Sequence, residues 1–293
     1  MSAMRSWPQS MALEPQLELD DFCDLVWRRG LERFRDLPWR HTHDPYAIWI
    51  SEVMLQQTQV TRVDGRWQRW LERFPSVEAL AQAAPAQVLE EWQGMGYNRR
   101  ALALLSAAQI IAARPQGFPM EVRDLVALPG IGPATAAGIR AFAFDLPGVY
   151  VETNVRTVFL HELFPGEEGV SDKALVPLVE ASCPRENPRG WYYALLDYGA
   201  WLKRTVPNPS RRSRTHVRQS KFEGSHRQKR AEVVRLLLAA RERGLSEKDV
   251  ARGLSKFEQA AGREAVSQSD VHDLLVELER EGFCRVSGDM WRT

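Results

Sequence analysis

The stretch 128-LPGIGPATAAG-138, followed by 151-VETNV-155, decides the fold that we predict for this chain. Glycines at 130, 132 and 138 surround a helix start of small residues, a pattern typical of a tight hairpin with outward-pointing backbone N–H groups. Such a hairpin holds a phosphate without any charged side chain, although a plain structural turn has the same pattern. With a carboxylate shortly downstream, it predicts an enzyme that holds nucleic acid and acts on it.

Helical periodicity dominates residues 17–202, where apolar side chains recur every three or four positions. The clearest segments are 22-FCDLVWRRGLERF, 76-SVEALAQAAPAQVLEEW and 101-ALALLSAAQIIAA, with helix starts at Ser76 and at Ala84–Pro85. We therefore predict an all-α fold with one catalytic domain over 17–202. Residues 1–16 precede the pattern and are expected to form a flexible tail.

The composition changes after residue 202. Residues 203–230 are rich in Arg, Lys, Pro and Ser and contain a single acid, Glu223, which predicts a linker or an extended basic arm. Residues 231–293 have the pattern of three helices and a short hairpin that turns at Ser287–Gly288–Asp289. This order of elements predicts a winged-helix-like module.

Bulk properties limit the kinds of protein. The formal net charge is only +1, so affinity for DNA depends on local basic patches. Cys23, Cys183 and Cys284 are far apart and odd in number, which argues against a disulfide scaffold and a Cys-x-x-Cys metal site. Membrane-span and signal-peptide patterns are absent from the sequence, so we expect a soluble, cytoplasmic protein.

Glu52 is the first candidate for chemistry, in 37-LPWRHTHDPYAIWISEVMLQQTQV. Apolar neighbours raise the pKa of a carboxyl group, which suits a general acid near neutral pH, whereas a glutamate on a helix surface is the ordinary alternative. The amides of Gln56 and Gln57 are suited to fill the gap left by an extruded base. Trp39 and Arg40 in the same segment are equally consistent with ordinary positions in the core and on the surface.

Several linked motifs resemble the helix-hairpin-helix (HhH-GPD) DNA glycosylase superfamily, above all its adenine-specific mismatch branch. They are 38-PWR, 44-DPY, 51-SEVMLQQTQV, 94-GMGYNRRA, 128-LPGIGPATA and 151-VETNV, in this order and spacing. The resemblance covers about residues 17–202. It implies a two-lobed helical fold with the active site between the lobes, on DNA that is bent and has its target nucleotide flipped out.

The resemblance also implies roles for single residues. Glu52 matches the acid that protonates the base, and Glu152 stands where the superfamily normally has Asp, the carboxylate that faces or bonds to the oxocarbenium-like sugar. Two carboxylates with divergent pKa values suit glycosidic cleavage. Asn154 matches a polar residue that positions the water or the sugar. The residues expected around the base are Trp39, Arg40 and Tyr193.

The expected DNA contacts come from three places. Gln57 and Tyr97 match residues that wedge into the duplex, and the hairpin matches a phosphate grip. The basic arm is expected to contact phosphates, unless it is only a solvated linker. The full set is Gln56, Gln57, Thr58 and Tyr97, then Gly130, Gly132 and Thr135 in the hairpin, and Arg211, Arg212, Arg214, Arg218 and Lys221 in the arm.

Two departures from the superfamily pattern predict missing features. Ala134 occupies the position where lyase-competent relatives carry the lysine that forms a Schiff base, so we expect no strand cleavage. The cysteines cannot supply the four thiolates of the iron–sulfur cluster that the superfamily commonly binds. We expect residues 203–230 to occupy the place of the cluster loop. We expect no cofactor or metal, and the single alternative is a monovalent cation bound at the hairpin.

Two further departures leave the substrate open. Tyr193 offers a phenol where the adenine branch typically has an amide or an acid, and residues 231–293 do not resemble the larger, β-rich domain that recognises 8-oxoguanine. We expect a monofunctional, monomeric glycosylase that acts on mismatched double-stranded DNA, with adenine as the favoured base, at the nucleoid of a bacterial-type cell and without membrane contact. The alternatives are a uracil or thymine mismatch glycosylase and a catalytically silent protein that binds DNA lesions.

Overall fold

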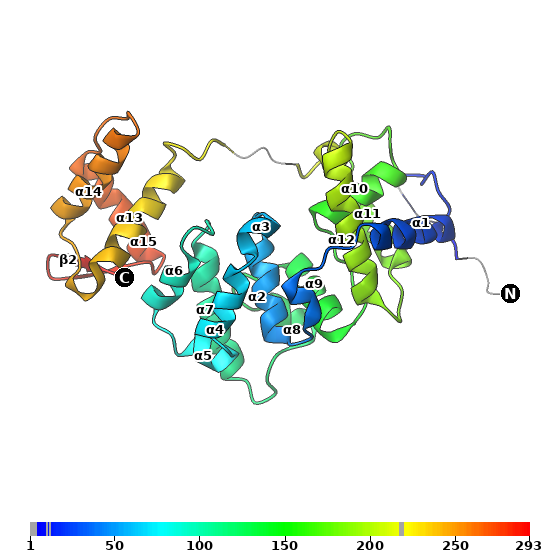
Figure 1. Ribbon diagram of the computed structural model, residues 1–293, viewed down its shortest axis with the longest axis horizontal. Helices are drawn as coiled ribbons and strands as arrows, with labels where there is room; N and C mark the ends of the chain where they lie inside the picture. Colours follow the sequence, from blue (N-terminus) through cyan, green and yellow to red (C-terminus); the bar gives the residue numbers. More distant parts are fainter. Residues whose placement is uncertain (1–4, 10, 12, 217–219) are drawn as a thin grey trace. The chain divides into compact units, whose positions relative to one another are not determined.

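The computed structural model describes residues 5–9, 11, 13–216 and 220–293. Contacts between Cα atoms divide the chain into two units, residues 1–53 with 118–218 and residues 54–117 with 219–293. Both units are mostly helical, which confirms the predicted fold class (Figure 1). Among the described residues, none of the helices has both the length and the hydropathy that crossing a bilayer requires.

The first unit is built around its longest helix, α12 (Pro188–Thr205), against which α1 (Leu19–Glu32) and α10 (Thr153–Glu162) pack. Aromatic rings join the three helices, since the ring centroids of Phe22 and Phe159 are 4.9 Å apart and those of Phe22 and Trp191 6.3 Å. The other elements are the 3₁₀ helix η1 (Pro38–His41), α2 (Pro45–Leu55), α8 (Val122–Val126), α9 (Pro133–Phe144), α11 (Asp172–Ser182) and the 3₁₀ helix η2 (Pro209–Arg212).

Helices α10 and α12 approach each other closely at Gly199. A Cβ at this position would lie 2.2 Å from the carbonyl oxygen of Asn154, so any larger residue would push the first turn of α10 away from α12. The start of α10, which carries Glu152 and Asn154, is thereby seated against the core of the first unit.

The second unit packs α7 (Arg99–Ala112) against α5 (Val77–Ala81) and α6 (Pro85–Trp92). The predicted helix starts are confirmed: Ser76 Oγ accepts a hydrogen bond from the backbone N–H of Ala79, and α6 begins at Pro85. The other elements are α3 (Val60–Val63), α4 (Arg66–Arg73), α13 (His226–Ala240), the 3₁₀ helix η3 (Arg241–Arg243), α14 (Glu247–Ala260), α15 (Gln268–Arg280), β1 (Arg285–Ser287) and β2 (Met290–Arg292).

The C-terminal part has the predicted order of three helices and a hairpin. Ser246 and Ser267 cap α14 and α15 through their side-chain oxygens, as their positions before each apolar pattern predicted. Strands β1 and β2 pair antiparallel with Val286 opposite Trp291, and the turn lies at Gly288–Asp289. The winged-helix-like relationship itself stays a prediction.

The basic arm differs from the predicted extended segment at both ends. Helix α12 continues to Thr205, and α13 begins at His226, because Ser225 caps it by accepting from the backbone N–H of Gln228. Pairing between Val170 and Ser213 also ties the arm to the first unit. Composition alone concealed these elements, since charged residues are compatible with an exposed helical turn.

Part of the predicted N-terminal tail is packed. The indole N–H of Trp7 donates to the carbonyl oxygen of Leu17 at 2.7 Å, and the Trp7 ring lies 5.7 Å from that of Phe22. Burial of this aromatic surface gives residues 5–9 a place on the first unit, which a composition-based interpretation of 1–16 missed.

Candidate active site

The carboxylate of Glu52 lies in a narrow site within the first unit, at the meeting of α2, α9 and the segment before α10. Tyr150 donates its hydroxyl to Glu52 Oε2 at 3.0 Å. A Cβ at Gly138 on α9 would lie only 2.3 Å from the same oxygen. Gly138 therefore belongs to the interior of α9 and makes room for the carboxylate, which differs from the hairpin role that the sequence suggested for it.

Burial raises the pKa of Glu52 to about 8, the hydrogen bond from Tyr150 opposes this, and the charge of Glu152 adds to the increase. The pKa of Tyr150 is also raised well above its ordinary value, chiefly by burial, so its hydroxyl stays a proton donor to Glu52. At neutral pH the carboxyl group of Glu52 is largely protonated. A neutral, partly buried acid of this kind can transfer a proton to a departing group.

Glu152 has a different environment, because its carboxylate caps α10. Its Oε1 accepts the backbone N–H groups of Asn154 and Val155, and its Oε2 accepts only a weak bond of 3.4 Å from Asn154 Nδ2. Burial raises the pKa of Glu152, while the two N–H groups and the charges of Lys203 and Arg156 oppose the increase. A helix N-terminus also favours the ionised form. Oε2 is thus the oxygen available to a positive charge.

Asn154 Oδ1 and the hydroxyl of Tyr193 are two of several buried polar atoms in this unit that have no hydrogen-bond partner among the described residues. Buried polar atoms are nearly always paired, so such atoms mark places for a bound molecule or water. Burial raises the pKa of Tyr193 to about 12, against the opposing charges of Arg189 and Arg40, so this hydroxyl is neutral.

Tyr193 is held by its ring. It stacks on Phe142 with centroids 4.5 Å apart and planes 8° from parallel, and the guanidinium of Arg40 lies 4.3 Å from the centre of the same ring. Arg189 lies over this ring at 5.4 Å and donates to the carbonyl oxygen of Arg40 at 2.8 Å. The phenol is therefore fixed in direction, as a group that reads a ligand must be.

Arg40 is buried rather than exposed, which corrects the surface alternative considered from the sequence. Its guanidinium donates to both oxygens of Asp197, at 2.7 and 2.8 Å, and Arg35 donates to the same carboxylate at 2.6 Å. The side chains of Arg40 and Asp197 are only 3% and 1% exposed. The guanidinium of Arg40 thus packs against the ring of Tyr193 and is itself held by Asp197. Trp39 is 4% exposed and lies in the core.

The predicted hairpin joins α8 to α9. Gly130 has φ 78°, a conformation that favours glycine, and Gly132 is the N-cap of α9, directly before Pro133. Both glycines are exposed, and a Cβ at Gly132 would meet nothing within 4 Å. The backbone directly before α9 is therefore uncovered at these glycines, as an anion grip at a helix start requires. Thr135 differs, since it is buried in the first turn of α9.

The residues predicted in the arm fall into two groups. Arg211, Arg214 and Lys221 are exposed, whereas the guanidinium of Arg212 donates to the carbonyl oxygens of Leu160, Phe164 and Glu167. Arg212 thus closes the C-terminal end of α10, a structural role in place of the predicted phosphate contact. Arg218 lies outside the described residues.

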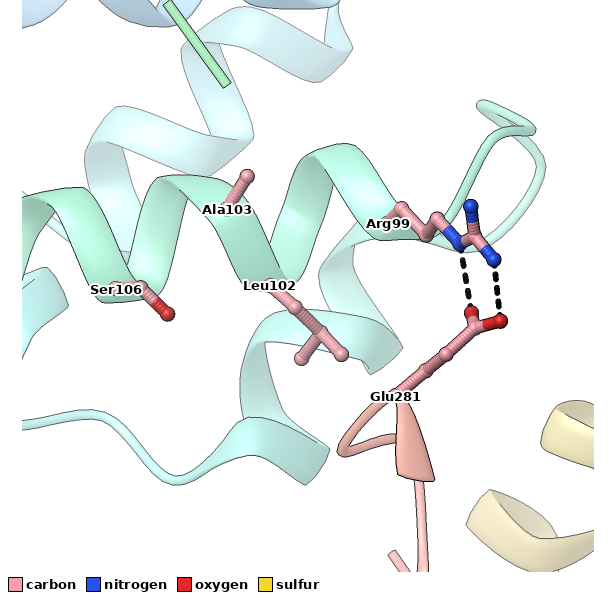
Figure 2. A pocket seen from close by; sticks show the side chains of 5 residues that line it. All are labelled: Arg99, Leu102, Ala103, Ser106 and Glu281. Atoms are coloured by element: carbon pink, nitrogen blue, oxygen red, sulfur yellow. Dashed lines mark hydrogen bonds and ion pairs between the residues drawn. The ribbon is translucent and has the colours of Figure 1, made fainter. Parts of the chain in front are cut away.

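Gln56, Gln57, Thr58 and Tyr97 belong to the second unit, in two turns. Tyr97 and Gln57 are exposed, and Gln56 and Thr58 are half-buried. A separate pocket of this unit lies on α7 and is lined by Arg99, Leu102, Ala103, Ser106 and Glu281 (Figure 2). Glu281 pairs there with Arg99, and the residues predicted as sites lie elsewhere.

The chain has three cysteines, one fewer than the four thiolates that an iron–sulfur cluster takes from cysteine alone. Burial raises the pKa of the thiols of Cys23, Cys183 and Cys284. Within the described ranges, no three His, Cys, Asp or Glu side chains gather as a metal site would require.

Some site residues were not apparent in the sequence. Tyr150, Asp197 and Lys203 are far from Glu52 along the chain, and only the folded first unit shows their roles. A signal existed for Asp197, since a lone acid in the apolar segment 191-WYYALLDYGAWL implies a buried partner.

The first unit thus combines a helical fold, a glycine hairpin before one helix and two buried carboxyl groups with different hydrogen-bond partners. Residues 50–173 match the HhH-GPD superfamily of base excision DNA repair proteins, and the chain belongs to this superfamily.

Similar proteins include adenine DNA glycosylases of two mycobacteria. That of Mycolicibacterium smegmatis is 38% identical over 169 residues, 57% of this chain and 58% of that protein. That of Mycobacterium tuberculosis is 33% identical over 234 residues, which cover 70% of this chain and 75% of that protein. A third, from Buchnera aphidicola, is 33% identical over 180 residues, 61% of this chain and 51% of that one. This chain therefore spans little more than half of two of these relatives.

Solved structures share the fold. A thermostable thymine-DNA glycosylase aligns with a TM-score of 0.55 at 24% identity, over 62% of this chain and 86% of that one. An endonuclease III trapped covalently on DNA aligns with a TM-score of 0.51 at 16% identity, over 72% and 94%.

Proposed function

We propose that this protein is a DNA glycosylase that hydrolyses the N-glycosidic bond of a flipped, mispaired adenine in double-stranded DNA. The observation that carries the proposal is the contrast between the two carboxyl groups of the first unit. Glu52, with a pKa of about 8, is the neutral acid, and Glu152, bound by two backbone N–H groups at a helix start, is the ionised partner.

The reaction then proceeds in two parts. Glu52 transfers its proton to a ring nitrogen of the base, which makes the base a better leaving group. Positive charge develops at the sugar as the bond breaks, and the open Oε2 of Glu152 faces it. Asn154 Oδ1, which lacks a partner among the described residues, accepts a hydrogen bond from the attacking water. The water oxygen bonds to the sugar carbon, and the proton that the water loses returns the carboxylate of Glu52 to its neutral form.

Adenine is supported by the curated relatives, which are described as adenine DNA glycosylases. The neutral hydroxyl of Tyr193 offers a donor and an acceptor to the edge of the base, in place of the amide or acid expected from the resemblance. The protein works as a monomer without an iron–sulfur cluster, and residues 231–293 form a winged-helix-like module that adds DNA contacts.

Strand cleavage is not part of the proposed activity. Ala134, at the start of α9, carries no amine for a Schiff base. The half-buried Lys203, whose charge acts on Glu152, keeps that carboxylate ionised in this proposal. Borohydride added to a reaction on an abasic duplex should therefore trap no covalent adduct. An abundant adduct that Lys203→Met removes would instead show a lyase.

A panel of single-mismatch duplexes tests the function. Each duplex carries A opposite G, C or 8-oxoguanine, or T or U opposite G, and alkali cleaves the abasic product after single-turnover incubation. We expect product on the adenine duplexes only, and none with Glu52→Gln. Product confined to T or U would identify a pyrimidine glycosylase, and tight binding without product would identify a lesion-binding protein.

A further inference from the structure

Two exposed turns of the second unit have strained backbones. Gln57 has φ 54° and Tyr97 has φ 50°, although neither is glycine. A left-handed conformation is unfavourable for such residues and persists only where the surroundings hold it. Both turns are those in which the sequence predicts residues that enter the duplex.

Arg100, in the first turn of α7, joins these two turns. Its Nη1 donates to the turn at Gln57 and its Nη2 mainly to the turn at Tyr97, at 2.5 to 3.2 Å. The acceptors are the carbonyl oxygens of Met54 and Gln56 and Thr58 Oγ1 on one side, and the carbonyl oxygens of Met95 and Gly96 on the other.

The same guanidinium lies against two rings, 5.1 Å from the centre of Trp92 and 5.5 Å from that of Tyr97. Burial lowers the pKa of Arg100 to about 10, and the group is still charged at neutral pH. A lysine ammonium group has three donors on one nitrogen, so it cannot make the five bonds that the two Nη atoms of this planar fork make to the two turns.

We propose that Arg100 is a positioning residue that fixes the turns of Gln57 and Tyr97 relative to each other, so that both tips enter the duplex as one rigid wedge. The proposal rests on the proposed function, because it requires DNA whose target nucleotide is flipped. Arg100 acts through the tips, without contact to the reacting atoms. Its effect therefore belongs to the flipping step and not to bond cleavage.

The adjacent arginine provides a matched control. Arg99 is in the same turn of α7, but its guanidinium pairs with Glu281 (Figure 2). Arg99→Lys and Arg100→Lys are thus the same substitution, one position apart. Only the second removes the bonds between the turns.

The test measures flipping directly, in a Glu52→Gln background that leaves the duplex intact. A duplex with 2-aminopurine beside the mispaired adenine reports unstacking by stopped-flow fluorescence. We expect Arg100→Lys to slow flipping about tenfold to 100-fold and to leave binding of an undamaged duplex within about threefold. Arg99→Lys should leave the flipping rate within about twofold of its parent.

Further variants separate positioning from folding. Thr58→Val removes one acceptor without changing Arg100 and should slow the same step by a smaller factor. In combination with Tyr97→Ala, the effect of Arg100→Lys should shrink, because both changes disable the same wedge. Melting temperatures and circular dichroism verify that each variant is folded.

The outcomes distinguish the inference from the function. A normal flipping rate in a folded Arg100→Lys protein, or full additivity with Tyr97→Ala, overturns the role of Arg100 alone. A parent protein that gives no fluorescence change with any duplex of the panel overturns the proposed function, and the wedge with it. Flipping without excision in the wild-type protein, which retains Glu52, would leave the wedge intact and overturn only the proposed chemistry.

Discussion

Gly138 lies directly against the carboxyl group of Glu52. A Cβ at Gly138 would stand 2.3 Å from Glu52 Oε2 and 3.0 Å from the Tyr150 ring, closer than real Cβ contacts allow. Because neither neighbour is a freely moving surface chain, a methyl group at 138 must displace the carboxyl group, the phenol or α9. One wall of the acid's site is therefore defined by the absence of a side chain.

Gly138→Ala should consequently abolish the proposed excision while leaving the protein folded. We expect the single-turnover excision rate to fall by about 10²–10⁴-fold, as for loss of a positioned acid. Gly166→Ala is the matched control, since a Cβ there meets nothing within 4 Å and its φ is not left-handed. Near-normal excision by Gly138→Ala would show that Glu52 tolerates displacement and is not the proton donor.

The pKa of Glu52 predicts the pH dependence of the reaction. A rate that requires the neutral acid should fall tenfold per pH unit above pH 8. Single-turnover rates between pH 5 and 10 measure this limb. If Glu52→Gln shows residual excision, and its rate falls with pH over the same range, the titrating group is not Glu52.

The free energy of unfolding should also depend on pH through the protonation of Glu52. The pKa of Glu52 is about 8 in the folded protein against an ordinary 4.5, so the folded state keeps a proton that the unfolded state loses. The associated stability is complete below pH 4.5 and declines as the pH rises through 8. The melting temperature of Glu52→Gln minus that of wild type should therefore be more positive at pH 8.5 than at pH 4. An unchanged difference between the two pH values would contradict the raised pKa.

Glu152 allows charge and geometry to be separated. Glu152→Gln retains an oxygen that caps α10 but removes the charge, so we expect a folded protein that excises about 10²-fold more slowly or worse. Glu152→Asp retains both cap and charge and should keep part of the activity. The reverse order, with Gln active and Asp inactive, would mean that charge at this position is not required.

Asp197 should be essential for stability. Asp197→Asn leaves the charges of Arg40 and Arg35 without a carboxylate in a buried site, a change that costs about 3–5 kcal/mol. Asp20→Asn, which removes the partly exposed partner of Arg5, should cost less than about 1 kcal/mol. Urea unfolding curves compare the two. Equal losses would contradict the structural role of Arg40.

The arm should affect binding and folding through different arginines. Changing Arg211, Arg214 and Lys221 together to Ala should weaken binding to every duplex and lower the slope of log K against log salt by about three. Arg212→Ala, by contrast, should lower the melting temperature and leave that slope unchanged, because its donors are used by the end of α10. An equal change of this slope in both proteins would show that Arg212 contacts DNA phosphates.

The helical fold, its capping residues and the place of Glu52 on an apolar helix are readable from the sequence, since each depends on neighbours within about one turn. Ser246 and Ser267 illustrate this, because each caps the helix that follows it directly. The charge state of Glu52 was also predictable in direction, since its apolar neighbours are adjacent on α2.

Other features arise only when distant elements pack. Tyr150, which donates to Glu52, is 98 residues away, and Asp197, which buries Arg40, is 157 residues from it. Neither pairing has a local pattern, because a hydrogen bond or ion pair depends on where helices meet and not on their spacing along the chain. The sequence by itself therefore determined the helices and the acid, and the tertiary structure decided which side chains surround that acid, because burial and pairing are properties of packed elements.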